Sequence, residues 1–181
     1  MALIRLNNQS ISSVTALPTG VGGKVLEVKQ TYVNTTSSQS TTANTWINIT
    51  DLEVSITPSS ASNKILIFVE WCGEHSEANP HNCTFGLKRD STNIGLPINY
   101  GNRQPGIAPI NISFTSNGDS TPENATYNYL DSPSTTSAIT YRATIYSQTG
   151  GTVYNNRTVG GGDVIDYESL TSSITAMEIA G

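Results

Sequence analysis

Four side chains of the types that bind zinc lie close together near the middle of the chain. They are Cys72, His75, His81 and Cys83, with Glu74 and Glu77 between them. Two thiolates and two imidazoles would complete a tetrahedral zinc site. Their spacing matches no standard zinc finger, however, and both histidines fall in one connection between expected strands. We therefore interpret the cluster as a polar loop and expect neither a metal nor any other cofactor.

Three acidic side chains in a glycine-rich stretch raise the question of glycan hydrolysis. They are Asp163, Asp166 and Glu168. Glycosidases use two carboxyl groups held at a fixed separation in a cleft. Acids gathered in one loop are more often simply solvated, and a catalytic assignment needs geometry first. We expect no enzymatic activity, and a host-glycan hydrolase is the last of the alternatives.

A long Gly/Pro/Asn-rich segment, residues 97–109, carries Tyr100 and Arg103. Loops mounted on a rigid scaffold often hold the binding function, and Tyr and Arg are favoured anchors in interfaces. This loop is therefore the candidate contact surface, for a receptor or for a neighbouring subunit. An ordinary ordered loop is the alternative.

The elements that must position these candidates are organised around the longest apolar run, residues 63–71 (NKILIFVEW). The run alternates with a period of two and contains no Gly or Pro, which predicts a strand. One face is expected to hold Ile65, Ile67, Val69 and Trp71. The other is expected to hold Lys64, Leu66, Phe68 and Glu70. This is the pattern of a central strand that is buried on one face and partly covered on the second.

Short alternating segments separated by turn residues follow over the rest of the chain. They predict about ten strands and an all-β fold, an antiparallel β-sandwich or jelly roll spanning residues 23–181. In the first strand we expect Leu26, Val28 and Tyr32 to face inward. Residues 34–45 are expected to form an uncharged surface loop.

The first 22 residues differ from the rest and are expected to form a short extended arm. Their apolar residues are isolated, and the polar residues between them are poor helix formers. Free termini are usually disordered unless something holds them, so we expect a partner or another copy of the chain to hold this arm. The candidate anchoring residues are Leu3, Ile4, Leu6, Ile11, Val14 and Leu17.

The composition excludes several classes of partner. Charged residues make up 13% of the chain and hydrophobic residues 36%, with a net charge of −5. The nine basic residues are scattered, whereas a nucleic-acid interface needs them gathered on one face. The low charge suits a chain whose surface is partly covered by copies of itself, because few charges need to be desolvated in the contact.

No apolar run approaches the roughly 18–20 residues of a membrane span, so we expect no membrane insertion. The N-terminus lacks the charged start and apolar region of a secretory signal. We therefore expect assembly in a host cytoplasm, where Cys72 and Cys83 are expected as free thiols. A disulfide between them is the alternative.

Several stretches together resemble small tail-fibre or structural virion proteins of marine tailed bacteriophages, of the kind found in cyanophages and pelagiphages. The matching stretches are MALIRLNNQSISSVTALP at the start, GGKVLEV from Gly22, SITPSSASNKILI from Ser55, LKRDST from Leu87, YLDSPSTTS from Tyr129 and ITAMEIAG at the end. They span nearly the whole chain. None is a chemical motif, so their number and order carry the resemblance.

The resemblance implies an N-terminal arm, residues 1–22, that attaches to capsid or tail proteins, and a β-domain displayed outward, typically as a homotrimer. It implies no enzymatic activity. We expect a fibre or knob at the virion surface that contacts a host cell-surface glycan or protein. The sequence shows no shaft repeats, so a capsid decoration or cement protein that stabilises the head is the main alternative.

Overall fold

The computed structural model describes residues 24–76, 82–98, 101–112 and 118–181. These ranges contain eleven strands and no α-helix. The strands are β1 (Val25–Val33), β2 (Ser37–Thr41), β3 (Thr45–Ile56), β4 (Lys64–His75), β5 (Cys83–Arg89), β6 (Thr92–Ile94), β7 (Ala108–Pro109), β8 (Glu123–Asp131), β9 (Ile139–Ser147), β10 (Gly151–Asn155) and β11 (Ser172–Ile179). The all-β prediction is confirmed.

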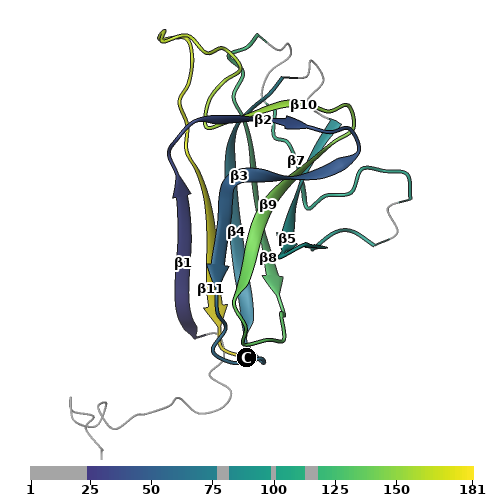
Figure 1. Cartoon of the computed structure of the whole chain (residues 1–181), viewed down its shortest axis with the longest axis vertical. Coiled ribbons are helices and arrows are strands. Elements are labelled where there is room, and N and C mark those ends of the chain that lie inside the picture. Colours follow the sequence, from purple (N-terminus) through teal and green to yellow (C-terminus); the bar gives the residue numbers. More distant parts are fainter. Residues whose placement is uncertain (1–23, 77–81, 99–100, 113–117) are drawn as a thin grey trace, which may run out of the picture.

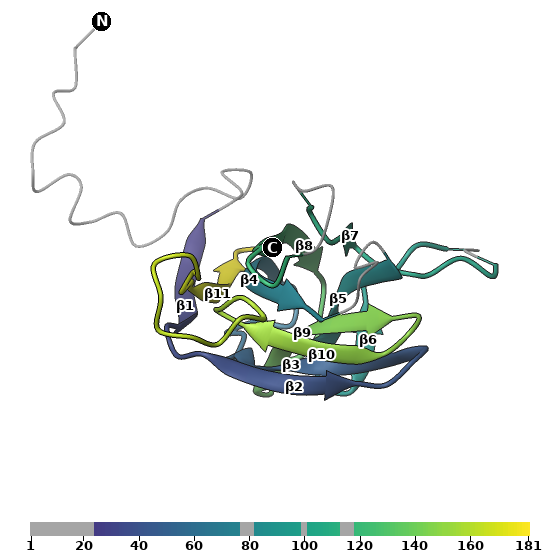
Figure 2. The ribbon, with the colours of Figure 1, turned by 90° about the horizontal axis from the view of Figure 1, so that it is seen from above.

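The strands form two antiparallel sheets that pack face to face as a β-sandwich (Figures 1 and 2). In the first, sheet A, the order is β1-β11-β4-β10-β2, and β8 pairs with the other edge of β4. In the second, sheet B, the order is β3-β9-β5-β6, and β7 also pairs with β5. Seen from above, β1, β11, β4 and β8 lie in one layer, and β3, β9 and β5 lie in the other (Figure 2).

Strand β4 is central, as its apolar run predicts. Its inward side chains are at most 1% exposed and belong to the core between the sheets: Ile65, Ile67, Val69 and Trp71. Each aliphatic side chain buried in this way contributes roughly 1.5–3 kcal/mol. The Trp71 ring packs on Phe85 of sheet B at 4.8 Å between centroids, and its indole N–H donates to Asn155 Oδ1 at 2.8 Å. The expected alternation of β4 is therefore confirmed.

Strand β1 corrects the sequence prediction. Leu26, Val28 and Tyr32 face outward and are 41%, 53% and 60% exposed. The less exposed positions of β1 are Glu27, Thr31 and Val33. Because β1 is an edge strand of sheet A with a register shift near its start, its side chains need not follow the rule that apolar residues face the core. The apolar face of this strand is on the surface of the chain.

The segment expected as a surface loop, residues 34–45, contains strand β2. This strand has no apolar residue, and it forms through its ladder with β10, which pairs Ser40 with Thr152 and Ser38 with Tyr154. Strand β3 is a single strand with a register shift between Asn48 and Glu53.

The two ends of the sandwich differ in what they carry. The start of β1 and the C-terminus lie at one end, the lower end in Figure 1, where the Ala180 amide donates to the Lys24 carbonyl at 3.0 Å. We call this the proximal end. The β1–β2 and β10–β11 connections, residues 34–36 and 156–171, lie at the opposite, distal end (Figure 1). A chain held through its N-terminal residues would present the distal end outward.

Candidate functional site

The outer face of sheet A carries a continuous apolar row. The strand registers place Val28 opposite Met177, Met177 opposite Leu66, and Leu66 opposite Leu130. The row therefore crosses β1, β11, β4 and β8 in sequence. Phe68, two residues along β4 on the same face, extends it and is 43% exposed. We call Val28, Leu66, Phe68, Leu130 and Met177 the apolar face.

Polar side chains border the apolar face. The next row toward the distal end reads Gln30, Thr175, Phe68 and Asn128, and the Gln30 amide donates to Thr175 Oγ1 at 2.9 Å. Charged Lys64 and Glu70 stand at its two ends along β4. An apolar centre with a polar rim is the usual composition of a protein interface.

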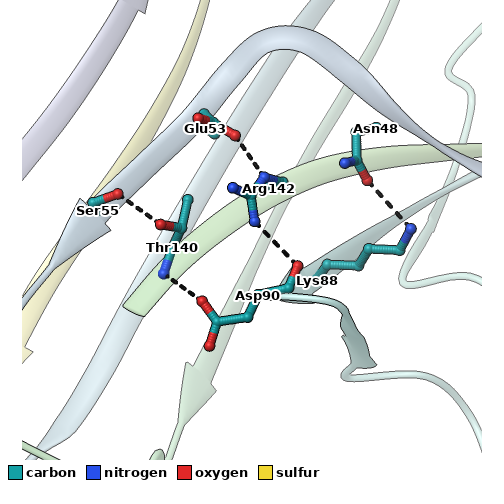
Figure 3. A network of polar contacts seen from close by, with 7 residues as sticks. All are labelled: Asn48, Glu53, Ser55, Lys88, Asp90, Thr140 and Arg142. Atoms are coloured by element: carbon teal, nitrogen blue, oxygen red, sulfur yellow. Dashed lines mark hydrogen bonds and ion pairs between the residues drawn. The ribbon is translucent and has the colours of Figure 1, made fainter. Parts of the chain in front are cut away.

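Part of the outer face of sheet B is polar and provides an internal comparison, whereas the Trp46 and Tyr146 rings pack together elsewhere on that face, 5.4 Å apart between centroids. Figure 3 shows its side chains joined across β3, β9 and the β5–β6 turn. Arg142 binds Glu53 at 2.6 Å and donates to the Asp90 carbonyl at 3.1 Å. Thr140 contacts Ser55 at 2.7 Å through its hydroxyl. A solvated sheet face looks like this, and the apolar face of sheet A does not.

A pocket lies at the distal end, in the β10–β11 connection. Its volume is about 260 Å³. It is lined by Thr36, Arg157, Gly160, Gly161, Gly162, Asp163, Val164, Tyr167, Glu168 and Ser169. We call it the distal pocket. Two of the three acids singled out in the sequence, Asp163 and Glu168, line it, whereas Asp166 is exposed beside it and is not part of the lining.

The connection that forms the distal pocket is fixed by buried polar side chains. Asn156 is fully buried, and its amide donates to the carbonyls of Val33 and Thr35 at 3.0 and 2.9 Å. The Ser172 hydroxyl donates to Asn156 Oδ1 at 2.6 Å. These bonds hold both ends of the connection against the β1–β2 turn.

Two buried acids, Glu74 and Glu123, lie next to the same connection, and Glu74 is hydrogen-bonded to it. Glu74, fully buried at the end of β4, accepts a hydrogen bond from the Val159 amide at 2.6 Å and one from the Thr121 hydroxyl. Glu123 of β8 is 2% exposed and accepts from the His75 amide at 3.0 Å. Burial raises the pKa of Glu123 to about 8; the hydrogen bond from the His75 amide opposes this rise, and the nearby Glu74 adds to it.

The sequence gives little sign that these two acids are buried. Acidic side chains are almost never buried without partners, so an acid in a sequence is expected at the surface. Nothing in the sequence around Glu74 or Glu123 distinguishes them from exposed acids. The sequence predicts Asp163, Asp166 and Glu168 to be solvated acids of a glycine-rich loop and does not indicate a pocket, and Arg157 and Tyr167 stand outside that pattern.

The remaining sequence candidates fall partly outside the described residues. Arg103 is exposed on the β6–β7 connection, but Tyr100 lies in an undescribed range, so their contact role stays a prediction. His81 and Glu77 are likewise undescribed. No disulfide joins Cys72 and Cys83, and the described ranges contain no group of His, Cys, Asp and Glu that could hold a metal ion.

The proposed anchoring residues also lie outside the described residues, which begin at Lys24. They are Leu3, Ile4, Leu6, Ile11, Val14 and Leu17. Across the ranges that the structure describes, no helix has the length and apolar character needed to cross a membrane. No protein-family model matches the sequence, and a search of curated proteins finds no match either.

Proposed function

We propose that this chain is a non-enzymatic structural protein of a tailed-phage virion, displayed at the particle surface as a homotrimer. The observation that carries the proposal is the apolar face of sheet A. A β-sandwich needs one buried face per sheet, so a second apolar row across four strands has no use in an isolated chain. Contiguous exposed apolar patches mark interaction sites, and the polar network on sheet B supports sheet A as the contacting side.

The partner that we propose for the apolar face is another copy of the chain. The face presents one cation and one anion, Lys64 and Glu70, at opposite ends of an apolar centre. Such a face can meet a copy of itself without burying charges of one sign. The low charged fraction of the chain, 13%, supports the same proposal. The number three comes from the resemblance to phage virion proteins.

The strand order supports a finer description of the fold. We infer a jelly roll, because each sheet contains a run of four paired strands, β1-β11-β4-β8 in sheet A and β3-β9-β5-β6 in sheet B, and the chain crosses repeatedly from one sheet to the other. Jelly rolls occur in viral capsid proteins and in lectins. Since a fold alone does not determine a function, this adds to the proposal without carrying it.

The arrangement of the ends supports the direction of display. In the proposal, residues 1–22 attach to capsid or tail proteins at the proximal end, and the distal loops face a host cell-surface glycan or protein. The test is a reconstruction of the virion that contains this chain. Copies grouped as trimers at the tail would support host attachment, and occupancy across the capsid lattice would make the chain a decoration or cement protein. Absence from the particle would contradict the proposal.

A further inference from the structure

The distal pocket has the size for one ring-shaped ligand. Its volume of about 260 Å³ is just below the roughly 300–1,000 Å³ of pockets that hold drug-sized molecules. The connection that forms it, residues 156–171, lies at the distal end of the sandwich, opposite the start of β1, where a displayed domain meets its surroundings (Figure 1). We propose that the distal pocket binds a single uncharged sugar unit of a surface glycan.

The charges of the lining disfavour an anionic ligand. Arg157 supplies one positive charge, and Asp163 and Glu168 supply two negative charges, so the lining has a net charge of −1. An anion such as a phosphate would be repelled by this net charge. A ligand without net charge avoids that cost.

The donors and acceptors of the lining match a molecule with several neighbouring hydroxyl groups. Arg157 Nη1 donates to the carbonyls of Thr158 and Val159 at 3.0 and 3.2 Å, and its Nε and Nη2 make no hydrogen bond to a described residue. These two donors therefore remain for a ligand. Carboxylates such as those of Asp163 and Glu168 accept hydrogen bonds at two oxygens. A hydroxyl both donates and accepts, so adjacent hydroxyls can use donors and acceptors together.

The pocket also offers an aromatic surface. Tyr167 is half-buried in the lining. Gly160 and Gly162 lie so close to its ring that a Cβ on Gly160 would come within 2.5 Å of the ring, and one on Gly162 within 3.3 Å. The absence of side chains at these two positions is thus what lets the ring sit in the pocket. The C–H face of a sugar ring is apolar enough to pack on such a surface, while the phenol stays hydrated.

The site is held in place before any ligand arrives. The Arg157 guanidinium stacks over the Tyr154 ring at 4.3 Å. The Gly160 amide donates to the Asp119 carbonyl at 2.8 Å, and the Ser120 hydroxyl contacts both the Asp166 carbonyl and, at 3.1 Å, Glu168 Oε2. Ordering a binding loop in advance reduces the entropy lost on binding.

The inference rests on the proposed function only for the origin of the ligand, a glycan on a host surface. The test uses the full chain and a panel of neutral sugars: D-glucose, D-galactose, D-mannose, L-rhamnose and N-acetyl-D-glucosamine. Inorganic phosphate serves as the anionic comparison. Binding is measured by ligand-observed NMR up to about 50 mM sugar, since single sugar units bind in the millimolar range when their contacts are few.

The matched variants are Gly161→Val and Gly118→Val. A Cβ on Gly161 would lie 3.5 Å from Arg157 Nη1, an ordinary contact, so valine fills the pocket without displacing the loop. Gly118 is exposed and has no atom within 4 Å of its Cβ position. We expect at least one sugar to bind saturably to the native chain, about tenfold weaker binding by Gly161→Val, and unchanged binding by Gly118→Val.

Three outcomes would overturn the assignment: no saturable sugar binding, equal binding by Gly161→Val, or displacement of the sugar by phosphate. Release of free sugar from a disaccharide, lost in Asp163→Ala, would overturn it in favour of hydrolysis. The reconstruction of the virion keeps the two proposals separate. Sugar binding by a chain that is absent from the virion would refute the proposed function alone, and a trimer in the virion that binds no sugar would refute the pocket alone.

Discussion

At the scale of single residues, the charge of Glu123 is set by folding. Burial is the largest cause of the rise of its pKa from 4.5 to about 8, with a smaller contribution from the nearby Glu74. Between these two values the folded chain keeps the proton that the unfolded chain releases. The stabilisation from this proton is complete below pH 4.5 and is lost as the pH rises through 8.

We therefore expect the free energy of unfolding to fall between pH 5 and 8, by at most about 1.4 kcal/mol per pH unit for this one proton. Glu123→Gln keeps the acceptor for the His75 amide and should remove the slope. Urea unfolding of the native chain and of Glu123→Gln across this pH range measures the two slopes. Both proteins are compared at the same protein concentration, because self-association makes the free energy of unfolding depend on concentration. Parallel pH profiles would show that Glu123 ionises normally.

Glu178 shows the opposite behaviour at the proximal end. Burial raises its pKa, but hydrogen bonds from Asn63 and from the hydroxyl and amide of Ser59 outweigh that effect, so its pKa is lowered. Glu178 lies on the same face of β11 as Ile174 and Ala176, and all three residues are buried. The three donors that make such a position tolerable lie far away in the sequence.

At the scale of elements, Asp131 connects the two sheets. This residue ends β8 in sheet A, and it accepts from Arg89 Nη1 at 2.9 and 3.1 Å and from the Tyr141 hydroxyl at 2.7 Å, both in sheet B. Because its side chain is 7% exposed, removing its charge leaves a partly buried guanidinium without its ion partner.

Asp131→Asn should therefore destabilise the fold by roughly 2–3 kcal/mol, somewhat less than the 3–5 kcal/mol for a fully buried pair. Glu53→Gln removes the exposed pair with Arg142 on the outer face of sheet B (Figure 3) and should cost under about 1 kcal/mol. Denaturant unfolding of both variants gives the comparison. A similar cost for the two would mean that Asp131 does not brace the sheets.

Strand existence and core alternation could be predicted where one strand face is wholly apolar, as in β4 and β9. Ile139, Tyr141, Ala143 and Ile145 are buried as their period of two indicates. The predicted orientation of β1 is wrong, because an alternating pattern shows which residues share a face of the strand but not which face meets the core. It also missed β2, where pairing with β10 rather than side-chain burial forms the strand.

The candidate sites were less predictable, for a related reason. The distal pocket joins Thr36 to the β10–β11 connection, and its support comes from Glu74 of β4, so its members are distant in the sequence. The apolar face depends on the register of four strands. The sequence contained a hint in Leu66 and Phe68, which are apolar on the face that was expected to be only partly covered.

At the scale of the whole molecule, the two outer faces of the sandwich have different chemistry, and this difference gives the chain a direction. The outer face of sheet B carries a polar network, and in the proposal the apolar face of sheet A meets copies of the chain. In the same proposal the proximal end serves attachment and the distal end serves contact with the host. Self-association through sheet A is the claim on which this arrangement depends.

The most direct test is the mass of the full chain in solution, measured by sedimentation velocity at micromolar concentration for three proteins. Leu130→Lys places a charge on the apolar face at a position that is 47% exposed in the single chain, so it should fold. Ser55→Lys places the same charge on the exposed outer face of sheet B. We predict that the native protein and Ser55→Lys sediment as trimers and that Leu130→Lys sediments as a monomer. A native protein that stays monomeric, or a Leu130→Lys variant that associates as the native protein does, would contradict it.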